Sequence, residues 1–173
     1  MALTLLRHAA LPLQYQRRFN GWRDIAIDEN LFQEQEIAIL KQIDFDFVYT
    51  SDLSRCIQTV EKMGIDNYFT DSRLREVRFR DEIEGLSFEE IKQLPSFKPR
   101  YTESLRRWHN YICDEHPALF EARIKSFLQD LPKDKEILVC SHSGTLQKMM
   151  LYLGFTKNKI DYLEWIRIEH ENL

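Results

Sequence analysis

The most constraining feature of this 173-residue sequence is a near-continuous apolar run from Ile137 to Cys140. A strand on a sheet with one solvated face alternates apolar and polar residues, whereas this run has no polar position. Such a run is typical of a central strand in a parallel sheet that is covered on both faces. It leads directly into Ser141-His142-Ser143-Gly144, so a histidine follows the end of the expected strand.

A second apolar strand is expected from Leu3 to Leu6, and it leads into Arg7-His8 in the same way. An imidazole, whose pKa lies near neutrality, thus stands beside a permanently charged guanidinium. This pairing suits chemistry on a negatively charged group. An isolated Arg-His pair, however, more often simply begins a polar loop.

Further helices and strands are expected along the chain from the spacing of apolar residues. The predicted helices are Asp28 to Ile43, Ser51 to Gly64 with Ser51 as N-cap, Ser87 to Leu94, a helix that begins at Pro117, and one that follows Gly144. The predicted strands are Phe45 to Tyr49, Tyr68 to Thr70 and an edge strand from Trp165 to Ile168. Because parallel neighbours need crossover connections, the alternation predicts an α/β fold: a three-layer, doubly wound, mostly parallel sheet with helices on both faces.

The chain length suits a single domain with a substantial core. We expect residues 1–173 to form one domain with a small helical insertion around 85–116 over the active site. Within it, Tyr101 to His116 has a less regular pattern and is rich in Arg, Trp and Tyr. Five of its side chains are candidates for lining a substrate entrance, although a surface helix is the favoured interpretation: Arg106, Arg107, Trp108, His109 and Tyr111.

The composition excludes several classes of protein. The formal net charge is -4, so a broad basic surface for nucleic acid is not expected and any basic site must be local. No segment approaches the roughly 20 apolar residues that a membrane span requires. The three cysteines, Cys56, Cys113 and Cys140, fall in apolar stretches, which favours free buried thiols in a reducing compartment. We therefore expect a cytoplasmic protein.

Three junctions that follow predicted strands carry chemistry-bearing residues. Arg7 and His8 follow one strand, Arg55 lies in the first helical turn after another, and His142 follows a third. Alone, Arg55 would be interpreted as a solvated helix residue. In open α/β sheets, however, the ligand crevice lies outside the carboxyl ends of the strands, so all four side chains are expected at one site.

Two guanidiniums at one site suit a tetrahedral dianion such as a phosphoryl group, because each can bind it in bidentate fashion. The sequence shows no cysteine or serine in a nucleophile setting and no carboxylate cluster or spacing for a metal. An imidazole that attacks phosphorus is then the economical mechanism. A proton donor would come from the charged stretch Arg73 to Gly85, where Glu76, Glu82 and Glu84 are all candidates. The same stretch would otherwise be a solvated face.

Five blocks of the sequence carry a resemblance to a known family. They are Arg7-His8-Ala9, Arg18-Phe19-Asn20-Gly21, Tyr49 to Thr59, Leu74-Arg75-Glu76 and Ser141-His142-Ser143-Gly144. With these blocks the sequence resembles the histidine phosphatase superfamily, which has the phosphoglycerate-mutase-like fold, in its branch of small cytosolic phosphatases. The resemblance runs over nearly the whole chain.

The resemblance implies a role for each matched residue. His8 would be the nucleophile that forms a phosphohistidine, and Glu76, now selected among the three glutamates, would protonate the leaving alcohol and later deprotonate water. Arg7, Arg55 and His142 would bind the phosphoryl oxygens. The remaining substrate-binding positions would be Arg18, Asn20, Gly21 and Ser143. The resemblance implies neither a metal nor another cofactor.

The sequence departs from the family pattern at several positions. Ala9 and Ser143 replace glycines, and Gln14 falls where many relatives have asparagine. Arg80 stands where glycine is usual, and we expect it to alter the shape of the pocket or to add a cation to it. These departures affect the choice of substrate most.

The leading hypothesis is a phosphatase that hydrolyses a small phosphorylated metabolite through a covalent phosphohistidine. Three alternatives stay open: a protein phosphohistidine phosphatase, a mutase of the same superfamily, and a catalytically degenerate module that binds phosphate esters. Retention of Glu76 argues against the first, because a phosphoramidate leaving group needs less acid help. The natural substrate and the oligomeric state are not indicated by the sequence.

Overall fold

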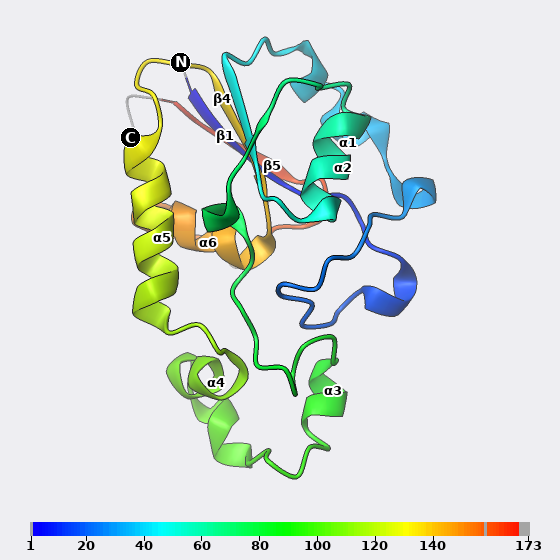
Figure 1. Cartoon of the computed structure of the whole chain (residues 1–173), viewed down its shortest axis with the longest axis vertical. Coiled ribbons are helices and arrows are strands. Elements are labelled where there is room, and N and C mark those ends of the chain that lie inside the picture. Colours follow the sequence, from blue (N-terminus) through cyan, green and yellow to red (C-terminus); the bar gives the residue numbers. More distant parts are fainter. Residues whose placement is uncertain (1, 158, 170–173) are drawn as a thin grey trace.

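Five strands form one sheet in the part of the chain that the computed structural model describes, residues 2–157 and 159–169 (Figure 1). They are β1 (Ala2–Arg7), β2 (Phe47–Thr50), β3 (Phe69–Thr70), β4 (Ile137–Ser141) and β5 (Trp165–Glu169), in the order β3-β2-β4-β1-β5. The pairs β3–β2, β2–β4 and β4–β1 are parallel, and β5 runs antiparallel to β1 at the edge. The predicted α/β fold with a mostly parallel sheet is confirmed.

Helices and short 3₁₀ turns connect the strands. The α-helices are α1 (Glu34–Ile37), α2 (Ser54–Lys62), α3 (Phe88–Ile91), α4 (Leu105–Ile112), α5 (Pro117–Asp130) and α6 (Ser143–Tyr152). The 3₁₀ turns are Leu13–Tyr15, Glu29–Leu31, Leu40–Gln42, Ser72–Leu74 and Pro99–Glu103. In Figure 1, α2 lies on one side of the strands and α5 and α6 lie on the other.

Successive residues of β4 enter different hydrophobic cores. Val139 belongs to a cluster with Ile124 and Phe127 of α5, whereas its neighbour Leu138 belongs to a cluster with Val60 of α2. Both faces of the central strand are therefore buried, and a polar residue at either position would lose its hydration. This explains why the run from Ile137 to Cys140 has no polar position.

The single helix predicted from Asp28 to Ile43 is wrong. Asp28 does cap a turn, because its Oδ1 accepts a hydrogen bond from Asn30 N at 3.0 Å, but the segment then breaks into two 3₁₀ turns and the four-residue α1. The apolar residues Ile37, Leu40 and Ile43 recur every three positions. That is the period of a 3₁₀ helix rather than the 3.6-residue period of an α-helix.

The predicted N-cap role of Ser51 is also wrong, because α2 begins three residues later, at Ser54. The cap comes from a distant loop: Asp24 accepts hydrogen bonds from Ser54 N at 2.7 Å and from Ser54 Oγ at 2.9 Å. A carboxylate at this position satisfies a free helix N–H and suits the positive end of the helix dipole. The Ser51 hydroxyl accepts a hydrogen bond from Leu53 N, just before α2, at 3.4 Å and also contacts a group at the end of β4.

Two helices occupy the region around residues 85–116. In α3, Ser87 and Glu90 form a capping box, and in α4 the Ser104 hydroxyl accepts from Arg107 N. The stretch predicted as less regular thus contains a two-turn helix. Figure 1 shows α3 and α4 together at one end of the molecule, away from the N-terminus.

Candidate active site

The parallel register of β1 and β4 brings the two predicted histidines together. Arg7 pairs with Ser141, and His8 N donates to Ser141 O at 3.0 Å, so His8 and His142 follow at the same edge of the sheet. Their ring centroids lie 5.2 Å apart, and both side chains are buried. The two histidines thus follow the ends of neighbouring strands, as the two apolar runs predicted.

The His8 ring is oriented by a backbone carbonyl. Its Nδ1 lies 2.8 Å from Ala9 O, and since a carbonyl oxygen only accepts, Nδ1 is the nitrogen that carries the proton. Burial, followed by the charges of Arg55 and Arg7, holds the pKa of His8 well below its ordinary value. In the neutral ring, Nε2 then has a free lone pair.

Arg55 is almost completely buried, with 2% of its surface exposed. Its Nε donates to His142 Nδ1 at 3.1 Å, Nη1 donates to Arg23 O at 2.6 Å, and Nη2 donates to Gly21 O at 2.7 Å. A guanidinium has five N–H groups, so two remain for a ligand. Arg55 is therefore not a solvated residue on the helix surface.

His142 is held between Arg55 and Ser51. Because Nδ1 accepts from Arg55, the proton of the neutral ring lies on Nε2, which donates to Ser51 Oγ at 2.9 Å. Burial, followed by the charges of Arg55 and of His8, holds the pKa of His142 well below its ordinary value. Ser51 therefore contacts the site through His142, in addition to its place just before α2.

Arg7 is positioned by the chain that precedes β5. Its Nη1 donates to Ile160 O at 2.6 Å, and its guanidinium carbon lies 4.0 Å from the centre of the Tyr162 ring. Tyr162 also approaches His8, with the ring centroids 5.6 Å apart. Sequence reasoning missed Tyr162. The sequence does not show the direction of β5, and Tyr162 reaches the end of β1 because β5 runs antiparallel to β1.

Glu76 is fixed at the start of α6. Its Oε2 accepts from Gly144 N at 3.0 Å, and its Oε1 accepts from Val77 N at 3.0 Å. A methyl group at Gly144 would lie only 2.5 Å from Glu76 Oε1, so this helix start has room for the carboxylate because residue 144 is glycine.

The other two candidate glutamates are engaged elsewhere. Glu82 Oε2 accepts from Ser96 Oγ at 3.2 Å, and Glu84 Oε1 accepts from Arg23 N at 2.9 Å. Neither of them lines the cavity that contains the two histidines, whereas Glu76 does.

A cavity of about 200 Å³ lies between these groups. All nine residues selected from the sequence line it: Arg7, His8, Arg18, Asn20, Gly21, Arg55, Glu76, His142 and Ser143. Five further residues complete the lining: Leu11, Arg17, Phe19, Phe79 and Tyr162. The site therefore combines four arginines, two neutral imidazoles, one carboxylate and a partly apolar wall.

Two of the predicted residues also support the walls of this cavity. Arg18 Nη1 donates to Gly85 O at 3.0 Å and forms an ion pair with Glu90 at 2.5 Å. Asn20 Nδ2 donates to Tyr15 O at 2.6 Å. The chain turns sharply between them and β1, where Arg17 has a φ of 56°. A left-handed conformation is uncommon outside glycine. Arg17 adopts it and lines the cavity.

The expectation that Arg80 would shape this pocket is wrong. Arg80 does not line the cavity, and its Nη2 donates to Asn110 O at 3.0 Å on the side of α4. Its neighbour Phe79 lines the cavity instead. Successive residues of an extended segment point to opposite sides, and the pairing of Phe79 with Cys113 shows that this segment is extended.

Other sequence expectations concern metals, thiols and membranes. Among residues 2–157 and 159–169, no group of three or more His, Cys, Asp or Glu side chains could hold a metal ion. Cys56, Cys113 and Cys140 are free and buried, as expected. In the same part of the chain, no helix has the length and apolar character needed to cross a membrane.

A comparison with protein families shows to which family this chain belongs. The profile of the histidine phosphatase superfamily (branch 1) matches residues 3–172. The chain belongs to this superfamily.

Individual relatives are distant. The 2,3-bisphosphoglycerate-dependent phosphoglycerate mutase of Pseudoalteromonas atlantica is 24% identical over 190 residues, covering 87% of this chain and 83% of the mutase. Among solved structures, TTHB049 from Thermus thermophilus matches with a TM-score of 0.75 and 23% identity, covering 98% of this chain and 94% of its own.

A further structural match was solved with a ligand. It is a phosphoserine phosphatase from Entamoeba histolytica in complex with 3-phosphoglyceric acid, with a TM-score of 0.77 and 23% identity, and the match covers 96% of this chain and 89% of that chain. At such identities the structural matches show the shared fold.

The two buried histidines predict a pH-dependent stability. Their folded-state pKa values are lowered, so below the unfolded-state value of about 6.5 the unfolded chain binds protons that the folded chain does not. The free energy of unfolding should therefore fall as pH drops from about 6.5 to 5, before most carboxylates titrate. Urea unfolding of the wild type and of His8→Gln/His142→Gln at several pH values measures this. An equally steep decline in both proteins would contradict the assignment.

Proposed function

We propose that this superfamily member is a phosphatase that hydrolyses a small-molecule phosphomonoester through a phosphohistidine on His8. One observation carries the proposal: His8 Nδ1 donates a hydrogen bond to Ala9 O and the pKa of the ring is lowered, so Nε2 is available as a nucleophile. His8 lines a cavity together with the guanidinium groups of Arg7 and Arg55 and the carboxylate of Glu76.

The first step transfers the phosphoryl group to the enzyme. His8 Nε2 forms a bond to phosphorus while the bond from phosphorus to the ester oxygen breaks. Glu76, in its protonated form, gives its proton to that oxygen, and the alcohol leaves. Arg7 and Arg55 neutralise charge on the three equatorial oxygens as the bond changes take place.

The second step regenerates the enzyme. Water attacks phosphorus, the Glu76 carboxylate takes a proton from that water, and the bond from phosphorus to His8 Nε2 breaks, so inorganic phosphate and neutral His8 result. All of these steps use side chains of this chain, and the proposed reaction requires neither a metal nor another cofactor.

His142 would act through its Nε2–H group. In the structure this group donates to Ser51 Oγ, and Nδ1 is occupied by Arg55. A phosphoryl oxygen would replace Ser51 as the acceptor, and the serine would hold the ring in its correct orientation between turnovers. At the start of α6 the Gly144 N–H already binds the Glu76 carboxylate, and the positive end of the helix dipole also favours an anion nearby.

The small cavity supports a small substrate. Its volume of about 200 Å³ suits a phosphoryl group with a short organic part, and Phe19 and Phe79 supply apolar surface for that part. The names of the relatives, which include phosphoglycerate mutase and phosphoserine phosphatase, support a phosphorylated metabolite of this size. The similarity to the mutases makes phosphoryl transfer back to an organic acceptor the second candidate function.

Replacement of His8 tests the nucleophile. His8→Ala should lower the hydrolysis rate of p-nitrophenyl phosphate by about 10³-fold or more, because the group that forms the covalent intermediate is removed. After rapid quench with a ³²P-labelled substrate, the wild type should carry a label that acid removes and base does not, and His8→Ala should carry none. Equal rates in the two proteins would refute the nucleophile assignment.

Replacement of Glu76 tests the proton donor. Glu76→Gln should slow release of phosphate from 3-phosphoglycerate or O-phosphoserine by about 10²–10⁴-fold, since an alkoxide leaves poorly without a proton. Glu82→Gln, which lies outside the cavity, is the matched control and should keep full activity. Unchanged turnover in Glu76→Gln would favour a phosphohistidine phosphatase. Transfer of label to an added alcohol acceptor instead of water would favour a mutase.

Gly144→Ala offers a subtler test of Glu76. The added methyl group would meet the carboxylate at 2.5 Å and displace it, so kcat should fall about tenfold or more. Gly144 lies in the first turn of α6 with no positive φ, so alanine should leave the free energy of unfolding unchanged or raise it by up to about 1 kcal/mol. Urea unfolding and steady-state kinetics on the same samples check both. Full activity in a stable variant would show that the position of Glu76 does not matter.

A further inference from the structure

A second cavity lies between α4, the turn Pro99–Glu103 and the segment that contains Arg80. Its volume is about 340 Å³, and it is lined by Arg80, Arg100, Tyr101, Arg107, Asn110 and Tyr111. None of these residues lines the cavity around His8. Small-molecule sites in proteins span roughly 300–1,000 Å³, so this cavity is large enough for a small organic ligand.

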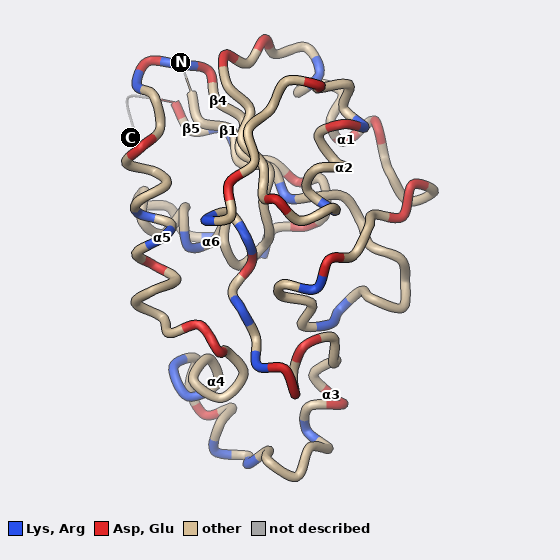
Figure 2. Tube along the Cα trace, in the orientation of Figure 1, with Lys and Arg blue, Asp and Glu red and all other residues tan. Residues whose placement is uncertain are grey.

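The lining of this second cavity is strongly cationic. Among the residues that the structure describes, the lining contains three arginines and no carboxylate. Arg107 forms an ion pair with Glu103, in which both side chains are more than half exposed, and this leaves a net charge of two positive units. Figure 2 shows basic positions, interspersed with acidic ones, along this end of the chain. The remaining positive charges repel one another, and a bound dianion would offset that repulsion.

The cavity has a fixed frame. Arg80 Nη2 donates to Asn110 O at 3.0 Å, and Arg80 N donates to Ile112 O at 2.9 Å, so this arginine is held against α4. The rings of Tyr101 and Tyr111 stack at 4.3 Å with an interplanar angle of 10°. Tyr111 is buried, and its hydroxyl lies 3.0 Å from Ser96 Oγ. The arginines and the tyrosine pair thus line the same cavity, in which Arg80 and Tyr111 are held by hydrogen bonds.

We propose that this second cavity binds a small organic phosphate, with the phosphoryl group on the three arginines and the organic part on the tyrosine pair. Guanidinium groups bind phosphoryl oxygens in bidentate fashion, and two net positive charges match a phosphate monoester dianion. The site is separate from the proposed catalytic cavity, but Phe79 of that cavity and Arg80 of this one are adjacent in the chain. The inference stands independently of the proposed phosphatase activity.

Backbone NMR can locate the binding. ¹⁵N-labelled protein is titrated with phenylphosphonate, a dianion that cannot be hydrolysed and has one aromatic ring, at constant ionic strength because exposed charges are screened by salt. The proposal predicts amide shifts at Arg80, Tyr101 and Asn110 that saturate with a dissociation constant of their own. Shifts at Gly21 and Gly144 would report the catalytic cavity separately.

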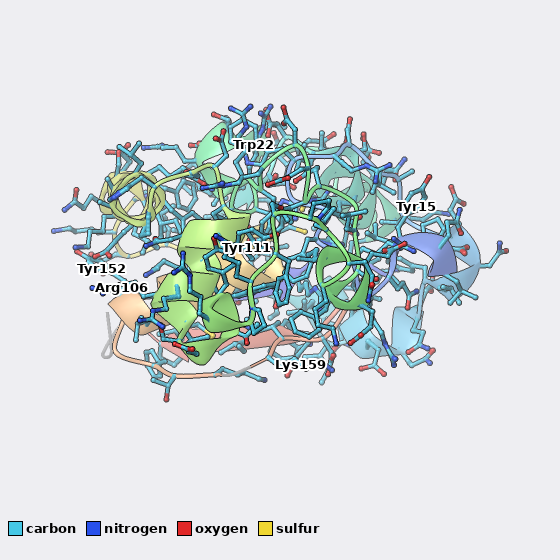
Figure 3. All side chains as sticks on the ribbon, turned by 90° about the horizontal axis from the view of Figure 1, so that it is seen from below. Tyr15, Trp22, Arg106, Tyr111, Tyr152 and Lys159 are labelled. Carbon is cyan, nitrogen blue, oxygen red and sulfur yellow. The ribbon has the colours of Figure 1, made fainter. Side chains whose placement is uncertain are left out.

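Matched variants make the test specific. Arg80→Ala and Arg107→Ala should each weaken binding at the second cavity by about tenfold or more and leave binding at the catalytic cavity unchanged. Arg106→Ala is the control: Arg106 is exposed and does not line the cavity, and in Figure 3 it lies toward the edge of the molecule whereas Tyr111 lies near the middle. This variant should bind like the wild type.

Three results would overturn the proposal. One is the absence of saturable shifts at Arg80, Tyr101 and Asn110 while the rest of the spectrum is intact. Another is equal weakening by all three arginine variants, which would indicate general charge attraction. The last is phthalate binding as tightly as phenylphosphonate, which would show that the cavity does not select a phosphoryl group. Loss of phosphatase activity would not produce any of these results.

Discussion

The candidate site depends on one buried guanidinium. Arg55 has 2% of its surface exposed, so its charge must be compensated by neighbours rather than by water. Its three hydrogen bonds reach the loop that contains Gly21 and Arg23, and the histidine at the end of β4. A helix, a loop and a central strand are therefore fixed around the same cation. Breaking any one of these contacts would leave a polar group buried without a partner, which is the costly outcome.

The position of the main candidate residues could be predicted because it follows from strand ends. An apolar run with no polar position reveals a strand buried on both faces, and the residue after it must lie at the ligand-binding edge. Two such runs, before His8 and before His142, were enough to place the two imidazoles together. Arg55 followed from the third junction. All nine residues selected from the sequence line one cavity, although their chemical roles are proposals that the experiments above address.

Two features that the sequence did not reveal depend on contacts between segments that are far apart in the chain. Asp24 caps α2 from thirty residues away, so no local pattern showed that Ser51 would contact His142 instead. Tyr162 covers Arg7 only because β5 runs antiparallel to β1, a direction that the apolar pattern of an edge strand does not reveal. The expected helix before β2 failed for a local reason, since its three-residue spacing fits a 3₁₀ turn better than an α-helix.

The cap that Asp24 provides has a consequence for anyone who redesigns this protein. The loop before Ile25 carries Asn20 and Gly21 to the cavity, and its last residues close the first turn of α2, on which Arg55 stands. Exchanging that loop to alter substrate preference would uncap the helix at the same time, at a cost of about 0.5–2 kcal/mol. A graft should therefore end before Asp24, or should supply its own acceptor for the Ser54 amide.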